Sequence, residues 1–249
     1  MVNDKKTHFG FESVKQTEKQ AKVNAVFSKV AARYDLMNDV MSLGVHHFWK
    51  WLSIYTANIK PHTKILDLAA GSGDLSRLIC KQHYPNLDLT LADINANMLM
   101  QGRMRMLNAG FFEHVHYSQV NAEALPFANQ TFDLSFMAFG LRNVTHQAKA
   151  LNELCRITKP GGKLCILEFS KPKNTLLSKA YDLYSFHVIP KLGQLFANDS
   201  VSYQYLVESI RMHPDQEKLK QMILNAGFDQ CEVINLSGGI VALHVAYRY

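Results

Sequence analysis

The sequence predicts a doubly wound α/β fold with a mostly parallel, seven-stranded sheet and an antiparallel hairpin at its C-terminal edge. Between residues 64 and 169, short apolar runs alternate with helical patterns, which is typical of βαβ units. A loop with two glycines follows the first of these runs. After Gly227, two apolar runs follow each other with no helix between them, so we expect them to pair as a hairpin.

The length and composition predict a single domain. With 249 residues, of which 47% are hydrophobic, the chain can bury one full core. We divide it into an N-terminal helical cap (1–60), a cofactor-binding core (61–173), a helical insertion (174–212) and a C-terminal helix with edge strands (213–249).

The N-terminal part carries an amphipathic helix and a patch of aromatic residues, and both precede the predicted sheet. Apolar side chains three and four positions apart form one stripe of the helix. Because these segments lie outside the α/β alternation, we expect them to contact the substrate. The stripe comprises Val23, Val26, Phe27, Val30 and Tyr34, and the patch comprises Phe48, Trp49 and Trp51.

Continuous apolar runs mark the strands of the core, and apolar residues at helical spacing mark the helices between them. Asn95 is the expected N-cap of the helix after the second strand. The helix before the fifth strand must end ahead of Pro160, because proline disfavours helical structure in the preceding residue. The predicted strands are 65–69, 87–92, 115–120, 132–139, 163–169, 231–236 and 240–249, the last two joined by Ser237-Gly238-Gly239.

The loop after the first strand predicts the cofactor. Gly71 and Gly73 let the backbone turn tightly close to a ligand. The dinucleotide fingerprint would need a third glycine where Ser76 stands, and it serves to bind a pyrophosphate. The acids Asp67 and Asp74 would instead repel phosphate and suit a cationic ligand. S-adenosylmethionine, with a sulfonium, an ammonium group and no phosphate, meets that description.

Two further segments complete the predicted cofactor site. Asp93 ends the second strand, 20 residues after Gly73, where a carboxylate can accept both hydroxyls of an adenosine ribose; the alternative is a helix cap. Asn121 and Ala122, together with Glu123, follow the third strand and are expected to meet the adenine edge, with ordinary turn chemistry as the alternative.

The insertion 174–211 is strongly apolar, and its first part, 176–189, contains only Lys179 and Asp182 as charges. A helix that is apolar on most sides must be covered by the domain, a partner, a lipid or a long apolar ligand.

Composition narrows the class of partner and the compartment. The net charge is +6, but the basic residues are scattered rather than gathered on one element, so we expect no nucleic acid. The N-terminal residues contain no signal peptide and no run reaches the roughly 18 apolar residues of a membrane span, so we expect a cytoplasmic protein. The cysteines form no C-x-x-C pair and are expected to be reduced: Cys80, Cys155, Cys165 and Cys231.

Long runs such as THFGFESV, ILDLAAGSGDLS and GIVALHVAYRY extend from residue 7 to residue 249, and the family-specific ones are FGLRNV, SKAYDLYSFHVIP and ESIRMHPDQ. These runs resemble one known family, the ubiquinone/menaquinone C-methyltransferases of the UbiE/MenG type. The resemblance implies a class I S-adenosylmethionine methyltransferase that methylates a ring carbon of a prenylated quinol, either 2-methoxy-6-polyprenyl-1,4-benzoquinol, demethylmenaquinol or both, and releases S-adenosylhomocysteine. Its cofactor contacts fall on Ser72, Asp93 and the Asn121-Ala122 pair, whereas Ala138 replaces a serine that the family often has.

Methylation of a quinol carbon requires loss of a ring hydroxyl proton, and the sequence offers several groups for this task. Arg142 and Asn143, after the fourth strand, can stabilise a phenolate and hold a water, or can form a salt bridge and a helix cap. His187 is the candidate base, with a hydrogen-bonded core histidine as the alternative. Tyr181 and Tyr184 are expected to line the substrate pocket.

No metal site is expected, because His46, His47 and His213 have no partner at ligand spacing. We further expect the N-terminal helices and the insertion to cover the prenyl tail. Docking on an anionic membrane, assembly with other quinone-biosynthesis proteins and homodimerisation stay open. Two other functions compete: a nicotinamide-dependent oxidoreductase, against which Ser76 counts, and a non-catalytic S-adenosylmethionine-binding subunit.

Overall fold

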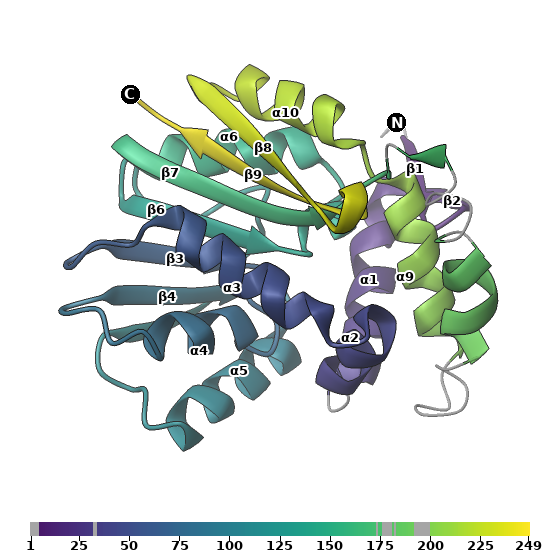
Figure 1. Cartoon of the computed structure of the whole chain (residues 1–249), viewed down its shortest axis with the longest axis horizontal. Helices are drawn as coiled ribbons and strands as arrows, with labels where there is room; N and C mark the ends of the chain where they lie inside the picture. The colour runs from purple at the N-terminus through teal and green to yellow at the C-terminus, as the bar shows by residue number, and fades with distance from the viewer. Residues whose placement is uncertain (1–4, 32–33, 173, 176–180, 182, 192–199) are drawn as a thin grey trace.

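A seven-stranded sheet forms the centre of the molecule in the computed structural model, which describes residues 5–31, 34–172, 174–175, 181, 183–191 and 200–249. Its strand order is β5-β4-β3-β6-β7-β9-β8 (Figure 1). Strands β3 to β7 run parallel, and β9 runs antiparallel to both of its neighbours, which confirms the predicted fold class. The strands are β3 (Lys64–Leu68), β4 (Asp88–Asp93), β5 (Val115–Gln119), β6 (Phe132–Ala138), β7 (Thr158–Phe169), β8 (Gln230–Leu236) and β9 (Val241–Tyr247).

Helices cover both faces of the sheet. Helices α6 (Gln147–Ile157) and α10 (Gln216–Asn225) pack on one face, while α3 (Val45–Ala57), α4 (Asp74–Cys80) and α5 (Ala96–Asn108) pack on the other. Because both faces are buried, the inner strands are apolar along their whole length rather than alternating with polar residues. This explains why continuous apolar runs predicted them.

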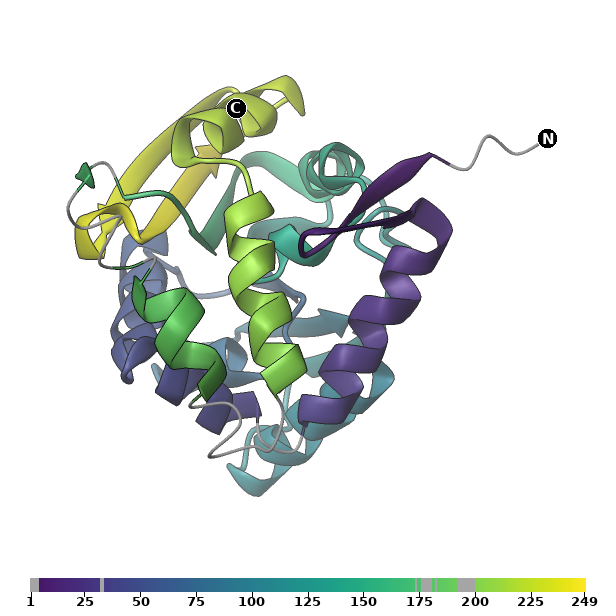
Figure 2. The ribbon, with the colours of Figure 1, turned by 90° about the vertical axis from the view of Figure 1, so that its right-hand side faces the viewer.

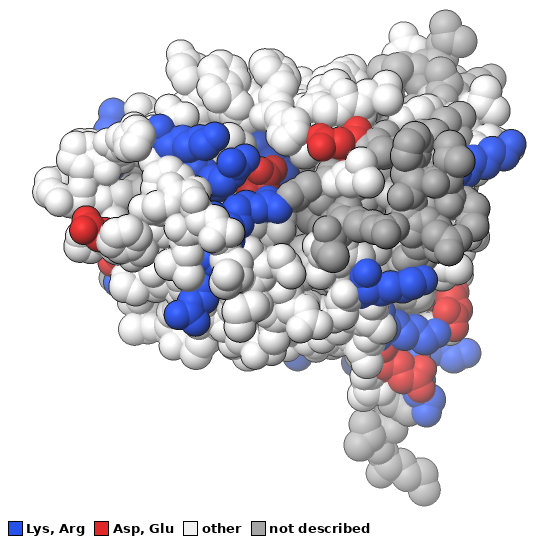
Figure 3. All heavy atoms as spheres, turned by 90° about the horizontal axis from the view of Figure 1, so that it is seen from below, with Lys and Arg blue, Asp and Glu red and all other residues white. Residues whose placement is uncertain are grey.

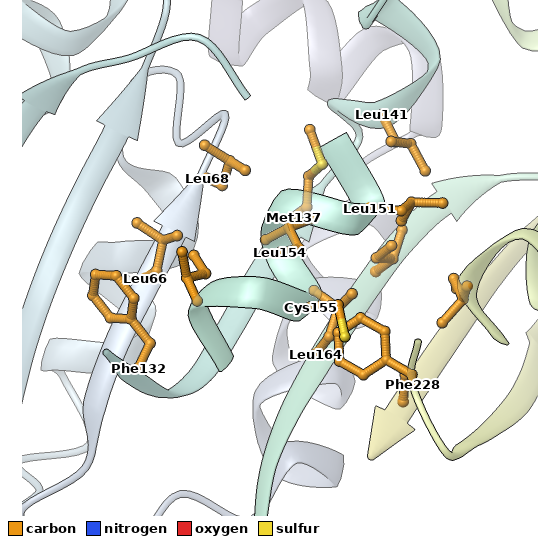
Figure 4. Packing of buried hydrophobic residues seen from close by; sticks show 14 of the residues in the cluster. Leu66, Leu68, Phe132, Met137, Leu141, Leu151, Leu154, Cys155, Leu164 and Phe228 are labelled. Carbon is orange, nitrogen blue, oxygen red and sulfur yellow. The ribbon is translucent and has the colours of Figure 1, made fainter. Parts of the chain in front are cut away.

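The alternation of side chains along each strand divides the core into two clusters. In β3, Leu66 and Leu68 point to the side of α6, whereas Ile65 points to the side of α3 and α4. Figure 4 shows the first cluster, in which side chains of α6 meet those of β3, β6 and β7. The four cysteines are free thiols; three are buried and Cys80 is half-buried.

A separate layer stands at the carboxyl ends of the parallel strands. It consists of α1 (Gln16–Val30), α2 (Tyr34–Ser42) and α9 (Ser200–Met212), and Figure 2 looks onto it with α9 between α1 and the π-helical turn Tyr184–Val188. A third cluster of buried side chains, which includes Val30, Met37 and Tyr203, holds this layer together.

The predicted helical cap, 1–60, needs two corrections. It begins with a β-hairpin, β1 (Lys6–Phe9) and β2 (Glu12–Lys15), whose four-residue strands are too short for a period-two pattern to stand out. Its last helix, α3, belongs to the layer on the sheet, because Trp49 and Ile54 are buried in the cluster beneath it.

The hairpin is fixed to α9. Its tip at Gly10 has a φ of +59°, and a side chain there would collide with Glu208. The amide of Phe11 donates to Oε2 of Glu208 at 3.0 Å, and the ring of Phe9 stacks on Tyr205 with 4.2 Å between centroids. The first residues of the chain thereby position the helix that lies over the carboxyl end of the sheet.

The predicted insertion, 174–212, is described only in part. Its last third is α9, but residues 176–180, 182 and 192–199 lie outside the described residues, as do Lys179 and Asp182. Within the described ranges, no helix combines the length and the apolar character needed to cross a membrane. On the face drawn in Figure 3, lysine and arginine side chains lie in separate small groups, some of them next to acidic ones.

A buried ion pair joins β7 to the short 3-10 helix η2 (Leu141–Asn143) that follows β6. Arg142 Nη1 lies 2.6 Å from Oε1 of Glu168, and the side chains are 3% and 1% exposed. The same arginine nitrogen donates to the carbonyl of Phe139 at 2.6 Å, and the Arg142 amide donates to Oε2 of Glu168. These contacts fix the backbone immediately after β6.

We expect Glu168→Gln to lower the free energy of unfolding by about 3–5 kcal/mol, because it leaves the buried Arg142 cation without its counter-charge. Urea denaturation measures the loss. The matched control is Glu12→Gln, which removes the same charge from the exposed Lys22–Glu12 pair and should cost less than about 1 kcal/mol. Equal losses in the two variants would contradict the role of burial.

Candidate active site

A cavity of about 800 Å³, its open mouth included, lies where the parallel strands end. The ends of β3, β4, β5 and β6 form its floor, and α1 covers it with Gln20, Val23, Asn24 and Phe27. Ligands of doubly wound sheets bind at this edge. The cavity also contains four of the seven predicted cofactor residues, namely Gly71, Asp93, Asn121 and Ala122.

The loop after β3 turns through residues in the left-handed region. Gly71 and Gly73 have φ values of +57° and +74°, as their predicted role requires. Helix α5 also packs closely against this loop at Gly102, where a Cβ would lie only 3.1 Å from the carbonyl oxygen of Gly71. Gly102 was missed in the sequence, since a lone glycine inside a helix carries no signal of a contact 31 residues away.

Asp93 connects the ends of two strands. One carboxylate oxygen accepts the Gly71 amide at 2.8 Å, and the other accepts the Asn95 amide at 2.8 Å. The backbone amide of Ile94 also interacts with this carboxylate, which offers about four acceptor positions and can therefore still accept a hydroxyl of a ligand in the cavity. The two readings of Asp93, backbone cap and ribose acceptor, are therefore compatible.

Asn95 continues this connection to the covering helix. Its side-chain oxygen accepts the Met98 amide at 3.0 Å, which confirms the predicted N-cap of α5. Its side-chain nitrogen donates to the carbonyl of Asn24 at 3.1 Å and to Oγ of Ser28 at 2.9 Å, both on α1. Hydrogen bonds thus run from the glycine loop through Asp93 and Asn95 to α1.

The turn after β5 forms the far wall of the cavity. Oδ1 of Asn121 accepts the amide of Glu123 at 2.9 Å, so ordinary turn chemistry is present here as well as a ligand wall. The Glu123 carboxylate lies 2.6 Å from Nδ1 of His146, whose Nε2 lies 3.0 Å from the Gln16 side chain at the start of α1. This turn therefore also anchors α1.

The other predicted cofactor residues, Asp67, Ser72 and Gly73, lie beside the cavity without lining it. Asp67 is 1% exposed and accepts a hydrogen bond of 2.6 Å from Oγ of Ser76, the serine that replaces the third glycine. Burial raises the pKa of Asp67 to about 7, against the opposing effects of Ser76 and Lys50. Ser72 Oγ accepts from Arg105 at 3.3 Å.

The interpretation of Asp74 as an acid directed at the ligand is wrong. Its Oδ2 lies 2.7 Å from Nζ of Lys50 on α3, and both side chains are buried. Burial alone would raise the pKa of Asp74, but Lys50 outweighs it and lowers that pKa. The negative charge is therefore neutralised within the protein, by a partner 24 residues earlier that no local pattern reveals.

The charge of the cavity lining nevertheless agrees with the predicted class of ligand. Among the described residues that line it, Asp93 and Glu123 are acidic and none is lysine or arginine. A diphosphate would find no counter-charge there, whereas a phosphate-free, positively charged adenosine compound would.

Arg142 and Asn143 have separate surroundings. Arg142 forms the predicted salt bridge, with Glu168, and lines a second, smaller cavity. Asn143 lines the main cavity, and its Oδ1 accepts a 2.9 Å hydrogen bond from the hydroxyl of Tyr205 rather than capping a helix. The two residues thus lie between the cavities and α9.

The structure does not bring His187, Tyr181 and Tyr184 to either cavity. His187 is exposed on the π-helical turn. Tyr181 lies beneath the guanidinium of Arg211, 5.1 Å from the ring centroid, and Tyr184 packs against the cluster of α1, α2 and α9. Burial raises the pKa of both tyrosines.

The expectation that His46 and His47 lack a partner is also wrong. Oδ1 of Asp39 lies 3.0 Å from Nε2 of His46 and 2.9 Å from Nε2 of His47. A carboxylate only accepts hydrogen bonds, so both imidazoles donate to one oxygen. The three side chains form a hydrogen-bonded cluster at the corner between α2 and α3. Asp39 precedes His46 by seven residues and His47 by eight.

Comparisons with known proteins agree with this geometry. A model of the ubiE/COQ5 methyltransferase family matches residues 15–248. The ubiquinone/menaquinone biosynthesis C-methyltransferases UbiE of Legionella pneumophila (strain Paris) and Methylococcus capsulatus are 54% and 52% identical, each over 100% of both chains. Among solved structures, two SAM-dependent methyltransferases share the fold, each with 16% sequence identity. The one from Aquifex aeolicus has a TM-score of 0.56 and covers 77% of this chain and 85% of its own. The one from Thermotoga maritima has a TM-score of 0.64 and covers 91% of this chain and 100% of its own.

We expect Asp67→Asn to stabilise the protein at neutral and alkaline pH. In the folded chain the Asp67 carboxyl keeps its proton up to a pH near 7, whereas in the unfolded chain it loses the proton near its usual pKa of 3.8. The contribution of Asp67 to the free energy of unfolding therefore falls as the pH rises between those values. The variant lacks that loss, and its advantage in unfolding free energy should grow from zero below pH 4 to about 4 kcal/mol at pH 8.

Urea denaturation across this pH range measures the difference. The exposed carboxyl of Asp229 provides the control, because Asp229→Asn should change stability by less than about 0.5 kcal/mol at every pH. A pH-independent effect of Asp67→Asn would contradict the raised pKa.

Proposed function

The chain belongs to the ubiE/COQ5 methyltransferase family, and we propose that it transfers the methyl group of S-adenosylmethionine to a ring carbon of a prenylated quinol in ubiquinone or menaquinone biosynthesis. The family resemblance read from the sequence is thereby confirmed. One observation carries the proposed chemistry: the cavity at the carboxyl edge of the sheet offers acids for an adenosine cation and no lysine or arginine for a phosphate among its described lining residues.

S-adenosylmethionine fits the residues present. We assign the ribose to the Asp93 carboxylate and the adenine to the turn at Asn121 and Ala122. Gly71 provides backbone without a side chain at the same edge. Ala138 lines the cavity where the family often has a serine, so that wall offers one polar contact fewer.

When bound, S-adenosylmethionine supplies an electrophilic methyl group, and the protein orients it and excludes water. Val23 and Phe27 of α1 form an apolar roof, which the hydrogen bonds from Asn95 hold in place. Fixing two reactants in line is worth roughly 7–11 kcal/mol of the barrier. We assign Asn143 to the boundary of the acceptor and Arg142 to electrostatic stabilisation of a quinol oxygen that loses its proton.

The exposed π-helical turn that carries His187, the predicted proton acceptor, also carries exposed apolar side chains. Leu183 and Phe186 are 63% and 37% exposed, and Phe186 stacks on Phe11 of the hairpin tip with 6.2 Å between centroids. Exposed apolar surface at the edge of α9 supports a path for the prenyl tail rather than a site of proton transfer.

We also propose that α3 docks on an anionic membrane, where prenylated quinols reside. Phe48, Trp51 and Tyr55 form an exposed stacked row along this helix, with centroids 5.9 Å and 5.5 Å apart. Aromatic side chains favour the membrane interface. Lys60 and Lys163 lie beside the end of the helix, Lys163 within 3.4 Å of the Ala57 carbonyl, and would meet anionic headgroups.

The proposed reaction is tested with pure protein, S-adenosylmethionine and each of the two reduced quinols, with mass spectrometry of the product. We expect one or both to gain a single methyl group. Asp93→Asn should weaken S-adenosylhomocysteine binding by about 10–100-fold in calorimetry, because it removes the negative charge from the ribose contact.

Asp88→Asn is the control for that variant, since Asp88 lies at the other end of the same strand, and it should bind normally. If the wild-type protein took up S-adenosylhomocysteine but methylated neither quinol, the acceptor would be wrong. If it took up no S-adenosylhomocysteine, the cofactor would be wrong as well.

For the membrane surface, we expect Trp51→Ser to reduce co-sedimentation with phosphatidylglycerol vesicles at least fivefold. Phe112→Ser, which removes an exposed aromatic ring before β5, should have no effect. Binding should also fall as salt is raised. Equal binding to neutral and anionic vesicles, unaffected by Trp51→Ser, would rule out docking through α3.

A further inference from the structure

A second, smaller cavity, of about 340 Å³ with its open mouth included, adjoins the cofactor cavity, and Phe139 lines both. Met41 and Phe169 make its walls apolar, whereas His46 and Arg142 bring polar groups to it. An aromatic ring with hydroxyl substituents matches this mixture of walls.

The corner between α2 and α3 fixes His46 in this wall. The His46 amide donates to Oγ of Ser42 at 3.3 Å, and the Gly44 amide donates to the carbonyl of Asp39 at 3.0 Å. Gly44 has a φ of +76°, which makes this sharp turn available without a Cβ penalty. The imidazole and the Asp39 carboxylate are therefore held 3.0 Å apart by the backbone of one short segment.

The two imidazole nitrogens of His46 differ. Nε2 must carry hydrogen, because it donates to the Asp39 carboxylate. Nδ1 then carries a lone pair, and this atom is buried with no hydrogen-bond partner within the described part of the chain. A buried acceptor without a donor destabilises the site, so a ligand hydroxyl that donated to it would be bound more tightly.

The surroundings keep His46 neutral. Burial, together with Lys50 and His47, lowers the pKa of His46 to about 4, against the raising effects of Asp74 and Asp39. These charges face it from α3, α2 and α4, and Arg142 faces the same cavity from η2. Asp74 pairs with Lys50, and Glu168 with Arg142, so the cavity receives no net charge from the two cations.

We propose that the quinol ring lies in this second cavity and that Nδ1 of His46 takes the proton of its hydroxyl, with Asp39 as the positioning residue. The proposal rests on the proposed function. The general base is then His46, which lies at the corner of α2 and α3 in contact with the acceptor, and not His187 on the exposed π-helical turn. A base oriented through its other nitrogen by a carboxylate is the arrangement that serves proton transfer in hydrolytic triads.

The step is balanced with the groups present. The O–H bond of the ring hydroxyl breaks, its proton passes to Nδ1, and the electron pair left on oxygen is shared with the adjacent ring carbon. That carbon bonds the methyl group as the bond from methyl to sulfur breaks, and the sulfur leaves as a neutral thioether. The methylated carbon then loses its hydrogen to water as a proton, and the ring oxygen recovers the proton from His46. One proton is released in each turnover, with no oxidant or reductant.

A phenolate next to His46 raises the pKa of the imidazole, as proton transfer to it requires. An anion in contact favours the imidazolium, so the low pKa of the empty site rises when the proton is transferred. Arg142, whose guanidinium lies 5.3 Å from the Phe169 ring centroid at the same cavity, stabilises the developing negative charge. Because its pKa is lowered, His46 is neutral at neutral pH before substrate arrives.

His46→Gln tests the proposal, because glutamine keeps a donor for Asp39 but offers no imidazole nitrogen. We expect kcat to fall by about 10²–10⁴-fold, with unchanged affinity for S-adenosylhomocysteine. For the wild type, kcat/KM should be constant between pH 6 and 8 and fall below about pH 5, as His46 takes up a proton. For the variant it should rise about tenfold per pH unit between pH 6 and 8, because hydroxide must then remove the proton.

Asp39→Asn provides a second, milder change at a half-exposed position, and we expect about a tenfold loss of kcat with the same constant pH profile as the wild type. His116→Gln is the matched control: this exposed imidazole also pairs with a carboxylate, Asp88 at 3.3 Å, but far from both cavities, and full activity is expected.

The outcomes separate the two proposals. If the wild type methylates a quinol and His46→Gln, folded and binding S-adenosylhomocysteine, keeps its rate or its flat pH profile, His46 is not the base. If the wild type binds S-adenosylhomocysteine but methylates no quinol, the proposed function fails independently of His46.

Discussion

The carboxylate of Asp93 is the interaction on which the candidate site depends. It accepts the amide of Gly71 from the loop after β3 and the amide of Asn95 at the start of α5. Asn95 in turn caps α5 and holds α1 through Asn24 and Ser28. One buried acid thus determines the spacing of two strand ends, the direction of one helix and the position of the helix that covers the cavity. A ligand hydroxyl that binds Asp93 therefore contacts the group that holds its own enclosure together.

The second organising feature is the neutralisation of charge around the cavities. Lys50 with Asp74, and Arg142 with Glu168, form buried pairs that join elements distant in sequence. The two cations that line the smaller cavity are therefore neutralised by their partners, which suits the neutral quinol that we propose for it better than an anionic metabolite. The cofactor cavity, by contrast, carries unpaired acidity at Asp93 and suits a cation. Phe139 lines both of these adjacent cavities.

The sequence predicted the parts of the fold that depend on local pattern. Apolar runs located all seven strands, and Asn95 located a helix start, because burial on both faces and capping leave short-range signatures. The hairpin at 6–15 was missed, since its strands are four residues long. Asp74 was misread and His46 undervalued, because Lys50 and Asp39 approach them only through the packing of α3 and α2. Gly71 and Asp93 were found because their roles follow from one loop and one strand end.

The order of the strands has a consequence for synthesis. Strand β9 follows β8 in sequence but lies inside the sheet, between β7 and β8. While the ribosome still holds residues 241–247, β7 has an open edge and β8 has no neighbour, so the nascent chain cannot close its sheet. Completion of the sheet therefore waits until residues 241–247 have emerged, and until then the exposed edge of β7 is a surface on which newly made copies can pair with each other. Removal of residues 241–247 would take out an inner strand of the sheet.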